Sequence, residues 1–177
     1  MGEREVKIKI ALCGEGGVGK TSLATVFVGA GFNPKMRLTV GVQHFFKDAQ
    51  SEGRKIRVTI WDLGGEHRFR FLAPTFLRGA RGLIFVFDVT REDTFLSLPR
   101  WLEIARSVVG DVPRLLVGNK VDLEELRVVP KEAAEDYARR EGFIGYVEAS
   151  ARLNLNVKEI FTLIVKEIVK GDLVWLE

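Results

Sequence analysis

The sequence predicts an α/β domain of three layers, in which helices cover both faces of a mostly parallel sheet. Two observations lead to this prediction. Short apolar runs alternate with amphipathic stretches along almost the whole chain, which is typical of parallel strands joined by crossover helices. One pair of runs is separated only by the turn "SEG" at 51–53, which indicates a hairpin with one antiparallel strand. We therefore expect a six-stranded sheet in a single domain that spans residues 1–177.

The expected strands are short runs rich in aliphatic and aromatic residues. They occupy 6–12, 39–48, 54–62, 82–89, 113–119 and 143–150. The run 82–89 is apolar almost throughout, as expected for a strand buried on both faces of a sheet. The expected helices occupy 22–31, 94–110, 131–142 and 156–171. Pro99 lies near the beginning of the second helix, and the last helix carries a continuous apolar face.

Composition and charge exclude several classes of protein. A formal net charge of +3 over 177 residues is too small to argue for a nucleic-acid partner. The single cysteine, Cys13, excludes an internal disulfide and a cysteine-based zinc site, and we expect a buried thiol. No apolar run reaches the roughly 18 residues of a membrane helix, and the ending "GDLVWLE" offers no cysteine for a lipid. We therefore expect a cytoplasmic monomer without a membrane anchor of its own.

The stretch "GEGGVGKT" follows the first strand and precedes the first helix, which is the context of a phosphate-binding loop. Glycines let backbone N–H groups converge on a polyphosphate, and the helix N-terminus adds a favourable dipole. Lys20 supplies a charge to the outer phosphates, and Thr21 offers a hydroxyl to Mg²⁺. The motif predicts a three-layer P-loop NTPase fold that binds a nucleoside triphosphate. Its candidate binding residues are Gly14, Glu15, Gly16, Gly17, Val18, Gly19, Lys20, Thr21 and the adjoining Ser22.

A second motif, "LLVGNKVDL", indicates which base is bound. Asn119, Lys120 and Asp122 stand at the carboxyl end of an expected parallel strand, where open sheets bind ligands. The Asp122 carboxylate can accept hydrogen bonds from the ring N–H and exocyclic amine of guanine. Adenine lacks that pair of donors and would leave the acid unpaired. The aliphatic stem of Lys120 can lie along the base, so the motif predicts guanine.

With these two motifs about 100 residues apart, the chain resembles the Ras-like small GTPases over nearly its full length. In the segment "EASAR", which resembles the last loop of that family, the resemblance implies that Ala151 N–H meets the guanine oxygen, between Ser150 and Arg152. Phe32 lies twelve residues after Lys20, where the family packs an aromatic ring against the base, although a core aromatic at a helix end remains the alternative.

The resemblance also implies two switch loops. Thr39 would ligate Mg²⁺ and touch the γ-phosphate through its N–H, Asp62 would hold the metal through water, and Gly65 would supply a second backbone donor. Mg²⁺ prefers oxygen ligands and keeps several waters, which suits this set together with Thr21. Loss of the γ-phosphate would release both loops.

The chain departs from the family pattern at several positions. "WDLGG" is similar to the Arf-like and Gα branches, whereas "TVGV" and Trp61 are Rab-like, and His44 stands where Rab-like proteins carry an aromatic. Glu66 replaces the glutamine that orients the attacking water. It could orient water in place of glutamine, leave hydrolysis very slow without a partner, or point to solvent while His67 or a partner acts.

The candidate catalytic residues are therefore Glu66, Lys20 and Arg37. Arg37 precedes Thr39 by two residues and is either a charge-stabilising arginine in cis or a solvated loop residue. We expect a Mg²⁺-dependent GTP-binding switch with slow intrinsic GTPase activity, whose segments 36–47 and 64–77 bind protein partners. The aromatic residues Phe45 or Phe46 and Phe69 or Phe71 could form that surface or belong to the core. The rival is a non-hydrolysing GTP-binding scaffold held in one state by Glu66.

Overall fold

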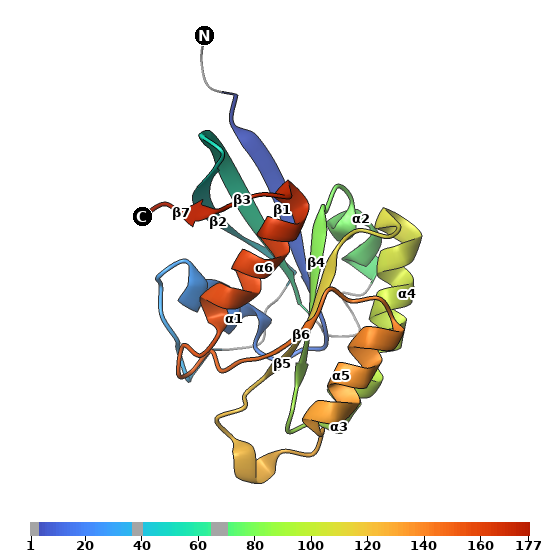
Figure 1. The fold of residues 1–177 in the computed structure, drawn as a ribbon. Coiled ribbons are helices and arrows are strands. Elements are labelled where there is room, and N and C mark those ends of the chain that lie inside the picture. Colours follow the sequence, from blue (N-terminus) through green and yellow to red (C-terminus); the bar gives the residue numbers. More distant parts are fainter. Residues whose placement is uncertain (1–3, 37–40, 65–70) are drawn as a thin grey trace.

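A central sheet dominates the computed structural model, which describes residues 4–36, 41–64 and 71–177. The strand order across the sheet is β6-β5-β4-β1-β3-β2-β7, and helices lie on both sides of it (Figure 1). Neighbouring strands within the group β6, β5, β4, β1 and β3 all pair in parallel. These five strands are β1 (Val6–Cys13), β3 (Arg54–Leu63), β4 (Gly82–Asp88), β5 (Arg114–Asn119) and β6 (Tyr146–Glu148). The predicted α/β class with a mostly parallel sheet is confirmed.

The predicted hairpin joins β2 (Val42–Ser51) to β3 in an antiparallel pair. Its turn lies at Glu52 and Gly53, with φ angles of 48° and 77°, as two-residue hairpin turns of the primed type require. The side chains of β2 alternate between the two faces of the sheet. Phe45 therefore packs against the core, whereas Phe46 is 58 % exposed.

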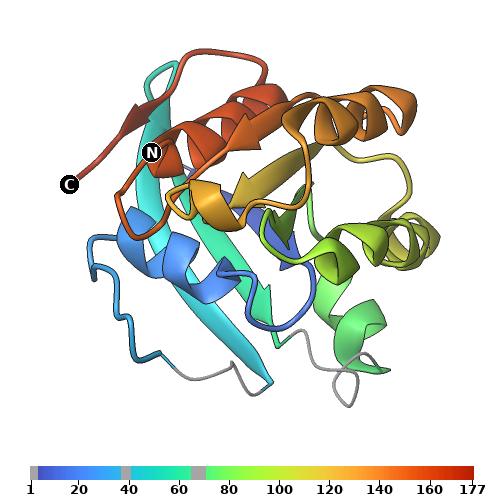
Figure 2. The same ribbon diagram turned by 90° about the horizontal axis from the view of Figure 1, so that it is seen from below.

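The prediction of six strands was one short, because residues Val174–Trp175 form a seventh strand, β7. It pairs antiparallel with β2, with Trp175 opposite Ala49 and Val174 opposite Gln50. The C-terminal segment thus lies along the outer edge of the sheet beside the hairpin (Figures 1 and 2). A strand of two residues has no measurable alternation, and its partner is more than 120 residues away in the sequence, so local pattern could not reveal it.

The helices form the outer layers. On one face, α1 (Lys20–Phe27) and α6 (Val157–Val169) pack on the sheet, and on the other lie α2 (Ala73–Leu77), α4 (Leu98–Val109) and α5 (Lys131–Arg140). No helix in the described ranges is both long and apolar enough to cross a membrane. The apolar face predicted for α6 is buried, with exposures of 0 or 1 % at Val157, Ile160, Phe161, Ile164 and Val165.

The single helix predicted over 94–110 is in fact two, α3 (Glu92–Leu96) and α4, which meet at Ser97. Pro99 explains the break, because it lacks the N–H that would bond to the Phe95 carbonyl and can occupy only the first turn of a new helix. The short helix α2 was not predicted at all. The core clusters on the two faces are separated by the sheet.

Cys13 lies in the second of these clusters and is 1 % exposed. This exposure confirms the predicted buried thiol, and burial raises its pKa to about 12.

Candidate functional site

The loop between β1 and α1 folds closely against β4 and β5. Gly14 and Gly19 have φ angles of 146° and 99°, a backbone conformation that residues with a side chain rarely adopt. A Cβ atom on Gly14 would lie 2.3 Å from the Val86 carbonyl oxygen, and one on Gly19 would lie 2.2 Å from Asn119 Nδ2. The glycines therefore let the backbone lie in direct contact with the ends of two parallel strands, where sheets of this kind bind ligands.

Lys20 begins α1 and is only 5 % exposed. Its Nζ donates hydrogen bonds of 2.9 Å to the carbonyl oxygens of Gly14 and Glu15. Burial lowers the pKa of Lys20, while the Asp62 carboxylate opposes that shift. A buried ammonium group costs free energy unless anionic charge lies close by, so the position of Lys20 fits a loop that binds an anion such as a polyphosphate.

Thr21 and Asp62 meet at the same end of the sheet. The Thr21 hydroxyl donates a hydrogen bond to Asp62 Oδ2, and Asp62 is fully buried at the end of β3. Within the described ranges no group of three or more His, Cys, Asp or Glu side chains could by itself hold a metal ion. Mg²⁺ does not need such a cluster, since it is commonly bound by one or two protein oxygens, substrate phosphates and water. The two oxygen-bearing side chains fit that mode of binding.

Asn119 joins the phosphate-binding loop to the loop after β6. It is 2 % exposed. Its Nδ2 donates to the Val18 carbonyl oxygen at 2.9 Å, and its Oδ1 accepts from Ala151 N–H at 3.3 Å. Any guanine oxygen that approached Ala151 N–H, as the resemblance implies, would share or replace the second bond. One side chain thus connects three loops at the carboxyl edge of the sheet.

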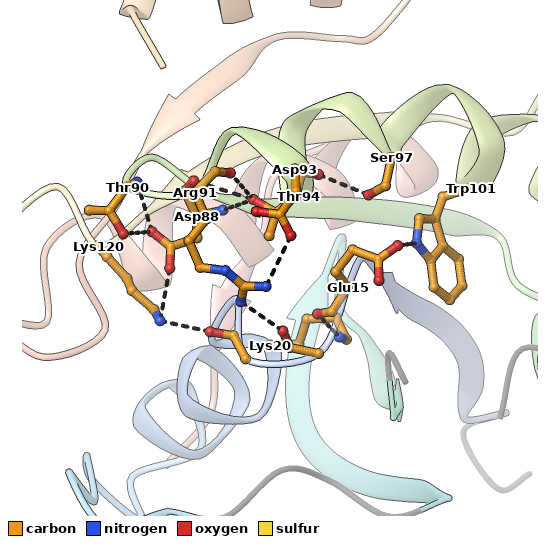
Figure 3. A network of polar contacts seen from close by, with 12 residues as sticks. Glu15, Lys20, Asp88, Thr90, Arg91, Asp93, Thr94, Ser97, Trp101 and Lys120 are labelled. Carbon is orange, nitrogen blue, oxygen red and sulfur yellow. Dashed lines mark hydrogen bonds and ion pairs between the residues drawn. The ribbon is translucent and has the colours of Figure 1, made fainter. Parts of the chain in front are cut away.

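Lys120 reaches back toward the same loop. Its Nζ donates to the Gly17 carbonyl oxygen at 2.7 Å and lies 3.0 Å from Asp88 Oδ2 (Figure 3). Asp88 is 1 % exposed, and its Oδ1 also accepts from the N–H and hydroxyl of Thr90. The buried carboxylate therefore fixes the lysine stem beside the position expected for a base.

Asp122 is oriented by Ser150, whose hydroxyl donates to Asp122 Oδ1 at 2.8 Å. Ser150 is fully buried, and its Oγ also accepts from Leu153 N–H at 3.1 Å. The hydroxyl thus links the acid of the second motif to the last loop. The sequence motifs at 119–122 and 148–152 come together here.

Three residues at this site were missed by sequence reasoning. Asp88 could have been found as an acid that ends a wholly apolar run. Arg91 and Trp101 carry no local signal, because their partners lie far away in the sequence. Arg91 Nη1 donates to the Gly16 carbonyl oxygen at 3.1 Å, and Trp101 Nε1 donates to Glu15 Oε1 at 3.2 Å (Figure 3).

The remaining predicted residues are placed as follows. Val18 is fully buried, and the Ser22 hydroxyl donates to the Met36 sulfur at 3.8 Å. Phe32 follows α1 and is 38 % exposed, and Arg152 is exposed in the last loop. Four predicted residues lie outside the described ranges: Arg37, Thr39, Gly65 and Glu66.

Comparison with known proteins agrees with this arrangement. A model of the Ras family matches residues 9–170. The Ras-related protein Rab-12 of Mus musculus is 38 % identical over 167 residues, which cover 94 % of this chain and 69 % of that protein. The Ras-related protein Rab-21 of Dictyostelium discoideum is 36 % identical over 170 residues, which cover 96 % and 80 % of the two chains. The chain therefore belongs to the Ras family of small GTPases, enzymes that bind GTP and hydrolyse it to GDP and phosphate.

Proposed function

We propose that this GTPase is a Mg²⁺-dependent molecular switch with slow intrinsic hydrolysis. The observation that carries the proposal is the contact between the base-reading motif and the phosphate-binding loop. Asn119 and Lys120, from the base-reading motif, donate hydrogen bonds to the Val18 and Gly17 carbonyls of the phosphate-binding loop. A nucleotide bound by both motifs would find them already held in place by each other. This lowers the entropy lost in ordering the site when the nucleotide binds.

For the phosphates we propose the backbone N–H groups of the loop together with Lys20. For the metal we propose Thr21 and Asp62, whose side chains meet beside that loop, together with Thr39. Mg²⁺ would neutralise charge on the outer phosphates when bound. For the base we propose Asp122 as the residue that selects guanine, held in orientation by Ser150.

The switch itself is proposed for the segments 36–47 and 64–77, where Thr39 and Gly65 would respond to the γ-phosphate. The described parts of these segments carry two strongly exposed rings, Phe46 at 58 % and Phe71 at 75 %. Exposed aromatic residues are favourable anchors for a protein partner. We propose that both rings belong to the surface that such a partner contacts.

Slow hydrolysis is proposed because Glu66 stands where the family uses glutamine. A carboxylate can accept a proton from water, but when ionised it repels the γ-phosphate and has no N–H to donate. Lys20 would still stabilise charge on the phosphates, and Arg37 is a further candidate for that role. The rival is a GTP-binding scaffold that does not hydrolyse.

One time course distinguishes the hydrolysing switch from the scaffold. Protein loaded with GTP is incubated with Mg²⁺ at neutral pH, and bound nucleotide is analysed by chromatography over several hours. The switch predicts conversion to GDP and phosphate with single-exponential kinetics, abolished by Lys20→Ala. Retention of intact GTP over the same period would support the scaffold instead.

A further inference from the structure

Three consecutive carbonyl groups of the phosphate-binding loop each accept a hydrogen bond from a side chain of another segment. The donors are a guanidinium from the connection that follows β4, an ammonium from the residue after β5, and an amide from the last residue of β5. The donor–acceptor pairs are Arg91 with Gly16, Lys120 with Gly17 and Asn119 with Val18.

These bonds determine where the neighbouring N–H groups point. A trans peptide is planar, and its C=O and N–H bonds point in opposite directions. A side chain that holds the Gly16 carbonyl therefore turns the N–H of Gly17 toward the other side of the loop. The same holds for the N–H groups of Val18 and Gly19. A charged donor on the carbonyl also polarises the peptide and makes its N–H a stronger donor.

Arg91 is held in place for this contact. It lies just after β4, where its own N–H donates to the Asp88 carbonyl oxygen at 3.0 Å. Its Nη2 donates to Asp93 Oδ2 at 3.1 Å while Nη1 reaches Gly16 (Figure 3). Two separate N–H donors of one rigid group thus connect an anchoring carboxylate to the loop. Lysine, which bears a single nitrogen, does not reproduce this geometry.

We propose that Arg91 is a positioning residue for the reaction of this GTPase: it orients and polarises the Gly16–Gly17 peptide, so that the Gly17 N–H becomes a stronger donor to the nucleotide phosphates. Charge that develops on the phosphates during hydrolysis is stabilised by donors that are already oriented. Arg91 would act through the peptide and not by touching the nucleotide. The inference rests on the proposed phosphate site.

The direct test is the amide resonance of Gly17 in ¹⁵N-labelled, GDP-bound protein. Arg91→Ala is expected to move the Gly17 amide proton upfield, because the carbonyl bonded to that nitrogen loses its charged donor. Single-turnover GTP hydrolysis should slow about fivefold, which corresponds to about 1 kcal/mol in the barrier. Arg91→Lys should give an intermediate Gly17 shift, since it keeps the charge but loses the two-pronged geometry.

Arg106→Ala is the matched control. The Arg106 guanidinium also donates to a backbone oxygen and a carboxylate, both of Glu141, and its side chain is 45 % exposed against 42 % for Arg91. Its removal should leave the Gly17 resonance and the rate unchanged. A Gly17 resonance in Arg91→Ala equal to that of the parent would overturn the proposal. If Arg91→Ala does not fold, a Gly17 resonance in Arg91→Lys equal to that of the parent would overturn the proposal instead. Failure of the parent to bind GDP would instead refute the phosphate site.

Discussion

Removal of the Asn119 side chain is expected to weaken both the fold and nucleotide binding. In Asn119→Ala, the Val18 carbonyl and the Ala151 N–H both lose their side-chain partner. Both residues are buried, at 0 and 4 % exposure. The phosphate-binding loop and the loop after β6 would lose the side chain that bridges them. Both the free energy of unfolding and the affinity for nucleotide should therefore fall.

The size of the effect follows from these two groups. A buried polar group left without its partner costs about 1–3 kcal/mol. Two such groups give a loss of about 3 kcal/mol in the free energy of unfolding, because water can reach the group nearer the surface, the Ala151 N–H. For a chain of this length the melting temperature falls by about 2–4 °C for each kcal/mol, so a decrease of about 6–12 °C is expected.

The assay is thermal unfolding followed by circular dichroism, in buffer with a fixed saturating concentration of GDP. Asn33→Ala is the control, because Asn33 is exposed and its Oδ1 accepts a local bond from Lys35 N–H at 3.0 Å. It should stay within about 0.5 kcal/mol of the parent. A melting temperature for Asn119→Ala within 2 °C of the parent, with unchanged GDP affinity, would refute the bridging role.

Three further outcomes are expected. Trp175→Ala should lose about 2 kcal/mol in urea unfolding, because this half-buried ring packs edge-on against Phe27 at 4.8 Å between centroids; a loss below about 0.5 kcal/mol would mean that β7 contributes nothing. Burial would raise the pKa of Glu148, but hydrogen bonds from Arg127 and Tyr146, together with the positive charges of Arg127 and Lys131, outweigh it and hold that pKa below its ordinary 4.5. The stabilisation is therefore present above pH 4.5 and is lost as pH falls through the folded pKa, so Glu148→Gln should be less stable at pH 7 and approach the parent in acid; a constant difference across pH would contradict this. Glu66→Gln should change the pH dependence of single-turnover hydrolysis between about pH 5 and 9, whereas identical profiles would remove Glu66 from the chemistry.

Much of the fold was predictable because its signals are local. The apolar runs, the "SEG" turn and the apolar face of α6 each occupy one short window of sequence. The phosphate-binding motif and the base-reading motif are also short local patterns, and together they carried the resemblance of the chain to a known family. Pro99 could have indicated the start of α4, since proline is accepted only in the first turn of a helix. The prediction extended that helix too far toward its N-terminus.

What local pattern could not supply was the set of long-range contacts. β7 pairs with a strand more than 120 residues away, and Arg91 contacts Gly16 across 75 residues. In the sequence, Arg91 is one of 27 Lys and Arg residues, most of which are ordinary solvated charges. Only the folded chain shows that this one reaches the phosphate-binding loop.

A competition experiment tests the central claim most directly. Protein loaded with a fluorescent GDP analogue in Mg²⁺ buffer is titrated separately with GTP and with ATP. If Asp122 selects guanine and the loop holds the phosphates, GTP should displace the analogue at a concentration at least about 100-fold below that of ATP. Equal displacement by the two nucleotides would contradict the account.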